Sequence, residues 1–247
     1  MTAALRAEVL KLRSLRITAG LLGIAAGYVL LNVIAILALQ GVEGSPADVG
    51  TAEGLDLVLG LGSSAYLFSF VIGVMASTGE YRHGTAVATF LAEPRRARVV
   101  VAKVVAAGLA GVGYGAACLA LALAVSLPWL GLIDHAPLGA GRVAAVAAGT
   151  VAAVALFAAI GAALGALVRN QVVALVSGLS WLLVGEGLLL AFLPEVGRWL
   201  PSGTLGSLTR TSPADEVLPP WAAALVLVAY AVALTAAAVA ATRRRDV

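Results

Sequence analysis

Hydrophobic positions in this chain gather in six long runs separated by short polar segments. The runs cover residues 17–39, 57–77, 99–127, 143–168, 172–193 and 221–242. A helix needs about 20 apolar residues to cross the roughly 30 Å hydrocarbon core of a bilayer, and each run reaches that length. The runs are apolar on every side and lack the alternation of membrane β-strands. The pattern therefore predicts an all-α integral membrane protein with six transmembrane helices.

Composition supports this prediction because the chain has too little charge to cover a water-exposed surface. Of its 247 residues, 61% are hydrophobic and only 12% are charged, and the mean hydropathy is +1.02. A soluble domain has about 25% charged residues. The connections between the runs are short, so the expected organisation is a single transmembrane domain over residues 1–247.

Lys and Arg residues favour one side of the predicted membrane domain. Thirteen of the sixteen lie at the two ends of the chain, at residues 78–103 and in the turn after the fourth run. The other side has a purely acidic first connection, residues 40–56. Because basic residues are retained in the cytoplasm, we expect both termini there, in a cell membrane. The first run is too long for a signal peptide, so we expect it to remain as an anchor.

Residues before the first run predict a short amphipathic helix on the membrane surface, over residues 5–16. Its apolar side chains share one stripe, formed by Leu5, Val9, Leu12 and Leu15. Arg13 lies off the stripe, whereas Glu8 and Arg16 intrude on it. A basic helix of this kind lies in the interface with the inner leaflet. A role as a positive-inside anchor alone fits the pattern equally well.

The most polar internal segment is residues 79–103, GEYRHGTAVATFLAEPRRARVVVAK. Gly84 permits a turn, and Thr85 can cap a short helix after it. That helix would place three apolar side chains on one face: Val87, Phe90 and Leu91. A short helix that exposes apolar residues between charges suggests a docking surface for another protein. A solvated hairpin that only reverses the chain fits these residues equally well.

The same segment carries a recognisable order of residues. An acidic residue precedes a Tyr-Arg-His-Gly-Thr run, which is followed by a Pro-x-Arg step and a Lys in the next run. The residues are Glu80, Tyr81, Arg82, His83, Gly84, Thr85, Pro94, Arg96 and Lys103. This order resembles permease subunits of ABC exporters in the type 2 ABC transporter family, notably those of high-GC Gram-positive bacteria. The resemblance extends to the basic N-terminal helix, the six runs, and the sequences WLLVGEGLLLAFLP and RWLPSG.

The resemblance implies how such a chain is powered. Residues 80–91 would form a coupling helix that docks on a dimer of separate cytoplasmic ATP-binding subunits, with the N-terminal helix beside it. ATP and Mg²⁺ would be held by those subunits, and this chain would bind no cofactor. A second permease subunit, identical or different, would complete the transport path in the lipid bilayer. Short extracellular helices at residues 194–220 would close its outer end.

The sequence carries no phosphate-binding loop of its own. Such loops need Gly-Lys-Ser/Thr, and neither Lys11 nor Lys103 follows a glycine. We therefore expect a transport subunit that is not itself an enzyme. The basic residues are dispersed without interleaved aromatic residues, so no nucleic-acid partner is expected. His83 and His135 fall on opposite sides of the predicted membrane, which excludes a metal or catalytic site shared between them.

Glu186 is the only carboxylate well inside a predicted transmembrane helix. A charge at that depth is unfavourable, so the default interpretation is functional, and we assign Glu186 to a transport path or gate. The resemblance adds Pro194 and Pro201 to this gate, because they break the connection after the fifth run. A structural, hydrogen-bonded Glu is the alternative.

Three pairs of glycines are spaced four residues apart: Gly23 and Gly27, Gly111 and Gly115, and Gly161 and Gly165. Such pairs allow two helices to approach closely. Chance spacing explains them as well, because the chain has 28 glycines. The single cysteine, Cys118, lies in the third run and is expected to serve in packing.

Together these features predict the permease subunit of an ABC exporter that carries an apolar or amphipathic compound, such as a drug, an antibiotic or a lipid-like molecule. An intramembrane enzyme would need a nucleophile and a base, or paired acids, at matched depth, and Glu186 stands alone. A secondary transporter or channel would need several ionisable groups near the midplane, or inverted repeats. A membrane sensor without transport remains open as an alternative.

Overall fold

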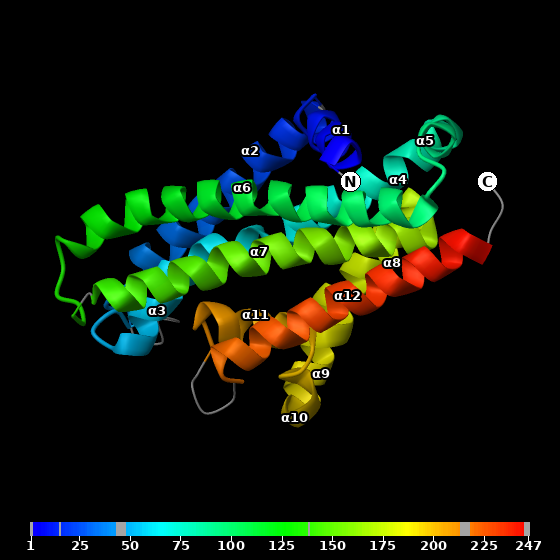
Figure 1. Ribbon diagram of the computed structural model, residues 1–247. Coiled ribbons are helices and arrows are strands. Elements are labelled where there is room, and N and C mark those ends of the chain that lie inside the picture. The colour runs from blue at the N-terminus through cyan, green and yellow to red at the C-terminus, as the bar shows by residue number, and fades with distance from the viewer. Residues whose placement is uncertain (1, 15, 43–47, 138, 213–217, 245–247) are drawn as a thin grey trace.

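The computed structural model describes residues 2–14, 16–42, 48–137, 139–212 and 218–244, and every regular element in them is helical (Figure 1). Six helical segments are long and apolar enough to cross a membrane: Arg16–Ala38, Ala52–Arg82, Arg96–Leu130, Ala140–Val168, Gln171–Phe192 and Pro220–Arg244. The expected all-helical fold with six candidate membrane spans is thereby confirmed. The chain has the architecture of a multi-pass membrane protein.

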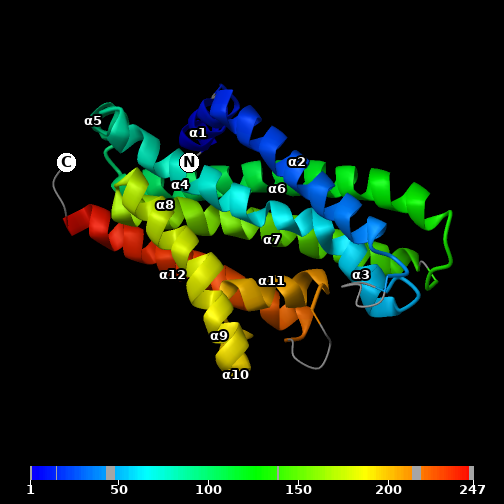
Figure 2. The same ribbon diagram turned by 180° about the vertical axis from the view of Figure 1, so that it is seen from behind.

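Two long helices, α6 (Arg96–Leu130) and α7 (Ala140–Val168), lie side by side at the centre of the bundle (Figures 1 and 2). Helices α4 (Tyr66–Arg82) and α12 (Pro220–Arg244) pack on α7, and α2 (Arg16–Ala38) packs on α6. In the most apolar stretch of α7, 61% of the residues are buried, whereas in the corresponding stretches of α2 and α12 only 22% are buried. The outer helices therefore leave most of their apolar surface available to lipid.

The second candidate span is built of three pieces. Helix α3 (Ala52–Gly60) leads through a 3₁₀ turn, η1 (Leu61–Ala65), into α4. The hydroxyl of Thr51 caps α3 by accepting a hydrogen bond from the backbone N–H of Gly54 at 3.1 Å. This cap starts the helix five residues before the apolar run that predicted it.

The fifth candidate span is also irregular. Helix α8 (Gln171–Ser180) continues through a π-helical turn, η2 (Trp181–Gly185), into α9 (Glu186–Phe192). Two short helices follow, α10 (Pro194–Gly197) and α11 (Pro201–Thr209). Each begins with a proline, whose missing N–H suits the first position of a helix. Short helices after the fifth span, as the resemblance implied, are thus present.

Glycines on α7 allow α4 to approach closely. A Cβ atom at Gly161 would overlap the carbonyl oxygen of Phe70, and one at Gly165 would lie 2.7 Å from the carbonyl oxygen of Val74. A larger residue at either position would push the two helices apart. This glycine pair therefore marks a helix contact.

The other two glycine pairs differ from each other. A Cβ atom at Gly111 or Gly115 of α6 would lie 2.7 or 3.1 Å from a Cα atom of α7, so this pair also packs closely. Gly23 and Gly27 on α2 have nothing within 4 Å of such an atom. The expected close approach of two helices is confirmed for two of the three pairs. For the pair on α2, no other part of the described chain approaches.

Gly161→Ala is expected to destabilise the bundle by about 1–3 kcal/mol, because the added methyl group overpacks the contact with α4. Unfolding can be followed with a thiol-reactive dye, because Cys118 is the only cysteine and is fully buried. Gly27→Ala is the matched control and should not lower the unfolding temperature. Equal unfolding temperatures for the two variants would contradict the packing described here.

Candidate functional site

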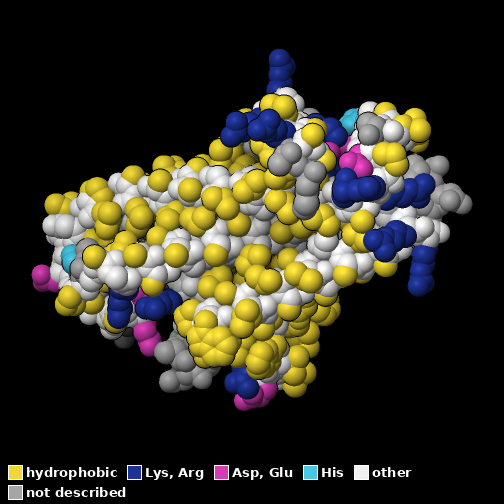
Figure 3. Space-filling model, in the orientation of Figure 1, with side chains coloured by type: hydrophobic (Ala, Val, Ile, Leu, Met, Phe, Trp, Pro, Cys, Tyr) yellow, Lys and Arg dark blue, Asp and Glu magenta, His cyan; other side chains and the backbone are white. Residues whose placement is uncertain are grey.

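Most of the Lys and Arg side chains visible in Figure 3 lie at one end of the bundle. This end is formed by α1 (Thr2–Ser14), α5 (Ala86–Ala92), the last turn of α4, the first turns of α6 and the end of α12. The surface between the two ends of the bundle is mainly hydrophobic in this view. The polar segment 79–103 thus lies where a membrane-spanning bundle would meet water.

Four charged side chains from three helices meet at this end. Lys103 of α6 contacts Oε2 of Glu8 at 2.9 Å and Oε1 of Glu80 at 2.8 Å. Lys11 contacts the same two carboxylates, at 2.8 Å for Glu8 and 2.6 Å for Glu80. These four residues are termed the charge cluster below. It joins α1 to α4 and α6 through ion pairs between residues as far as 95 positions apart.

The charge cluster is largely removed from water. Side-chain exposure is 5% for Lys103, 8% for Glu8 and 11% for Glu80, against 45% for Lys11. Buried charges are tolerated only when they are paired and hydrogen-bonded, and two cations with two carboxylates meet that condition. Burial by itself would lower the pKa of Lys11, but its hydrogen bonds to Glu8 and Glu80 outweigh burial and raise that pKa. Lys11 therefore keeps its positive charge at neutral pH.

Helix α1 packs on α6 through the apolar stripe that the sequence indicated. The side chain of Leu12 is buried, and those of Leu5 and Val9 are half-buried. Glu8 interrupts the stripe because it faces Lys103 across the helix contact. The apparent flaw in the amphipathic pattern is thus an ion-pair partner, and an acidic residue within an apolar stripe was the one sequence signal for it.

The two basic residues assigned to this helix are both exposed. Arg13 is exposed on α1. Helix α1 ends at Ser14 and α2 begins at Arg16, so the predicted C-terminal end of the helix at residue 16 was wrong. Leu15 lies outside the described residues.

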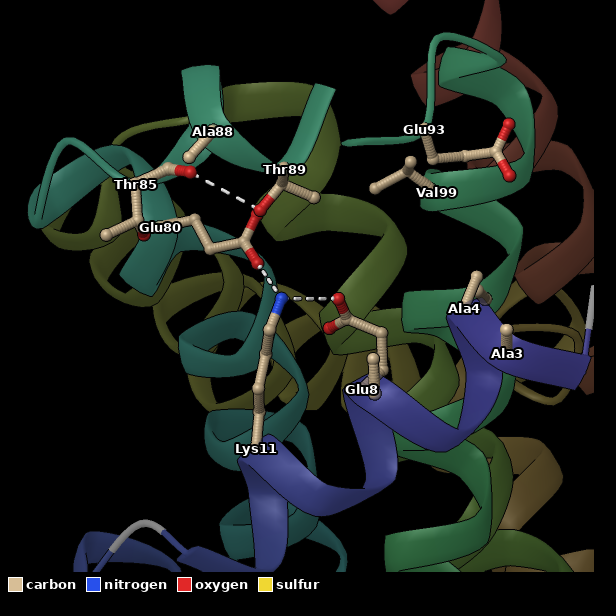
Figure 4. Close-up of a pocket in the computed structure, with 12 residues that line it drawn as sticks. Ala3, Ala4, Glu8, Lys11, Glu80, Thr85, Ala88, Thr89, Glu93 and Val99 are labelled. Carbon is tan, nitrogen blue, oxygen red and sulfur yellow. Dashed lines mark hydrogen bonds and ion pairs between the residues drawn. The ribbon is translucent and has the colours of Figure 1, made fainter. Parts of the chain in front are cut away.

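A cavity of about 590 Å³ opens beside the charge cluster, between α1, α5 and the first turns of α6 (Figure 4). Lys11 reaches across it from α1 toward Glu80. Small side chains, such as Ala4 on α1 and Ala88 on α5, form much of the remaining wall. Helices α1 and α5 thus form separate walls of the cavity.

Helix α5 follows the turn predicted from the sequence. Gly84 adopts a left-handed conformation with φ +68°, and Thr85 occupies the position before the first helical residue. The Thr85 side chain makes no capping hydrogen bond, so that prediction was wrong. Instead its carbonyl oxygen accepts from the Thr89 hydroxyl at 3.3 Å, and its N–H donates to the Glu80 carbonyl oxygen at 2.9 Å. Backbone bonding to α4 therefore fixes the start of α5.

The outer face of α5 is apolar and open. Val87 is 52% exposed and Leu91 is 77% exposed. Phe90 lies within α5, but its side chain lies outside the described residues. At least two of the three residues expected on one apolar face are thus free of contacts that would bury them.

Tyr81 and Arg82, which follow Glu80 in the motif, contact the end of α7 and the start of α8. The guanidinium of Arg169, at the end of α7, lies over the Tyr81 ring at 5.2 Å from its centroid. Arg82 donates to the side-chain oxygen of Gln171 at 3.3 Å. His83 is exposed. Consecutive residues of the motif therefore contact different parts of the bundle.

The residues assigned to a transport path are only partly together. Glu186 is fully buried, and its Oε2 accepts a hydrogen bond from the backbone N–H of Ser202 at 2.6 Å. Glu186 and Pro201 line a cavity of about 270 Å³ together, whereas Pro194 is exposed and does not line it. Glu186 thus ties the fifth span to the start of α11, which gives it a structural contact whatever its part in transport.

No three His, Cys, Asp or Glu side chains in the described residues lie close enough to share a metal ion. The ring of His135 contacts the carbonyl oxygen of Ala136 at 2.7 Å.

Neither comparison with models of known protein families nor comparison with curated protein sequences gives a match. In the part of the chain that the structure describes, every regular element is helical and six segments are candidate membrane spans.

Lys103→Met is expected to reduce the free energy of unfolding by about 3 kcal/mol or more, because two buried carboxylates lose their buried cation. Lys11→Met removes a half-exposed partner of the same carboxylates and should cost about 1 kcal/mol or less. Thermal unfolding followed through Cys118 measures both. If the two variants lost equal free energy of unfolding, the buried Lys103 would contribute no more to stability than the half-exposed Lys11, which would contradict this account.

Proposed function

We propose that this chain is the transmembrane permease subunit of an ABC exporter, driven by ATP hydrolysis on a separate cytoplasmic subunit. The observation that carries the proposal is the short helix α5, which exposes Val87 and Leu91 and borders the cavity beside the charge cluster. An apolar face on a helix fixed between two membrane spans fits a docking surface, because a hairpin that only reversed the chain would not need it.

The charge cluster gives such a docking surface a rigid support. Glu80 lies on the last turn of α4, and Lys103 lies near the start of α6, so their contact closes the base of the segment that carries α5. Glu8 adds α1 to the same unit. A displacement of α5 by a bound partner would therefore move α1, α4 and α6 together.

The distribution of basic residues supports a cytoplasmic position for this end. Lys and Arg gather around α1, α5 and the end of α12 (Figure 3). Basic residues near membrane-spanning helices are retained in the cytoplasm, where ATP-binding subunits are also found. Both termini of the chain are then cytoplasmic, and α10 and α11 lie toward the outer side.

In the assembled exporter, a dimer of ATP-binding subunits holds ATP and Mg²⁺, and a second permease subunit completes the path through the bilayer. The scarcity of charge in the spans suits an apolar or amphipathic cargo. Glu186 and Pro201, which line a common cavity, are our candidates for the path or its gate.

A photo-crosslinking amino acid at position 91 tests this proposal. We expect a cross-link to a protein that contains a Gly-Lys-Ser/Thr phosphate-binding loop, because the Leu91 side chain points away from the bundle. The matched control is position 132, because Leu132 is 85% exposed but lies in the connection between α6 and α7, at the other end.

Leu91→Asp should reduce co-purification of the cross-linked ATPase by about tenfold, since one buried apolar contact is worth about 1.5–3 kcal/mol. Leu132→Asp should leave it unchanged. If position 91 yields no ATP-binding protein in cells, or both positions yield the same one, the permease assignment fails and a membrane sensor becomes the better interpretation.

A further inference from the structure

Another pocket lies on the opposite side of the last turn of α4 from the charge cluster, with a volume of about 470 Å³. Here the ends of α4 and α7 meet the start of α8. Its polar wall includes Arg82, Arg169, Asn170 and Gln171, and none of its lining residues is acidic. The pocket is therefore positively charged.

Arg169 has an unusual backbone conformation. It follows the last residue of α7 with φ 60°, the left-handed region, where helices most often end in glycine. A non-glycine residue is strained there, and such strain is concentrated at functional sites. Arg210 shares this conformation at the end of α11, with φ 57°, so the case for a site rests on the surroundings of the Arg169 side chain.

The Arg169 side chain is held in place but is not saturated with hydrogen bonds. Its guanidinium lies over the Tyr81 ring, a cation–π contact that fixes its plane. Its Nε and Nη2 atoms are buried and have no hydrogen-bond acceptor among the described residues. Arg169 also lines the pocket, so its positive charge can act on an anion bound there.

The other walls of the pocket also favour an anion. Arg82 is held over the start of α8 by its hydrogen bond to Gln171. Asn170 caps α8 by accepting from the N–H of Val173 at 3.1 Å. The N-terminus of a helix carries partial positive charge, which adds to the charge of the two guanidinium groups.

Neither arginine is neutralised within the part of the chain that the structure describes. The ion pairs found there include none from Arg82 or Arg169, whereas the cations of the charge cluster, one helix face away, are matched by two carboxylates. The pocket thus contains two positive charges that no carboxylate of the described residues balances. A phosphate group would supply the charge and the acceptor oxygens that both guanidinium groups bind well.

An exposed apolar strip continues from the pocket along α8. Val172 is 69% exposed, Val173 is 52% exposed and Val176 is 60% exposed. These residues belong to a candidate membrane span, so lipid acyl chains can lie against them. A ligand with a phosphate at one end and a hydrocarbon chain at the other fits both features.

We propose that this pocket binds the headgroup phosphate of an anionic phospholipid, with Arg82 and Arg169 as the phosphate ligands and the acyl chain lying along α8. The site requires only that the helices span a membrane. It is independent of the proposed ATPase partner, and either proposal can fail while the other stands.

Native mass spectrometry of the full chain in detergent, titrated with phosphatidylglycerol, tests the site. Arg82→Gln together with Arg169→Gln should weaken binding by about tenfold or more, because two charge-assisted hydrogen-bonding groups are lost. Arg82 is exposed, so Arg82→Gln alone should fold normally and weaken binding by about threefold. Phosphatidylcholine should bind less tightly than phosphatidylglycerol.

Two control variants separate this site from general attraction to a basic surface. Arg210→Gln changes an arginine with a similar φ of 57° at the end of α11, and Arg95→Gln changes an exposed arginine at the same end of the bundle. Both should bind phosphatidylglycerol like the wild type. The proposal would be overturned if either control variant lost as much affinity for phosphatidylglycerol as the test variants. It would also be overturned if both test variants bound phosphatidylglycerol like the wild type, or if the wild type bound phosphatidylcholine as tightly as phosphatidylglycerol. Displacement of the lipid by an equal concentration of inorganic phosphate would overturn the lipid assignment.

Discussion

The ammonium group of Lys103 lies between the carboxylates of Glu8 and Glu80, and the end of the molecule that carries α1 and α5 is organised around it. Three charges at 5–11% exposure are stable only while they remain paired, so the helices that supply them are held in one arrangement. Without this contact, α1 would be attached to the bundle only by its short apolar stripe. The charge cluster therefore fixes the arrangement of α1, α4 and α6, the helices next to α5.

The last turn of α4 divides two surfaces of different character. Successive residues of a helix point about 100° apart, so Glu80 faces α1 and α6 while Tyr81 and Arg82 face the turn between α7 and α8. On the first side the charges are balanced and buried. On the second side Arg82 and Arg169 are left without a counter-charge among the described residues. One side thus holds the chain together, and the other is suited to an external anion.

The sequence predicted the six candidate spans well because lipid demands long apolar runs, a local property of the chain. It placed the start of the second span five residues late, because Glu53 and Asp56 hid a helix that Thr51 caps. It could not pair Glu8 with Lys103, since contacts across 95 residues leave no trace in local spacing. It also gave Thr85 a side-chain capping bond that the structure does not contain. The π-helical turn before Glu186 had no sequence signal.

Hydrogen–deuterium exchange of the chain in lipid nanodiscs, with and without the ATP-binding subunit recovered by cross-linking, tests the central claim most directly. The account predicts that binding slows exchange in Ala86–Ala92 and in Thr2–Ser14, because α5 forms the contact and the charge cluster joins α1 to its support. It predicts no change in Ala52–Gly60 at the far end. Protection of that far end, or an unchanged rate in both Ala86–Ala92 and Thr2–Ser14, would contradict it.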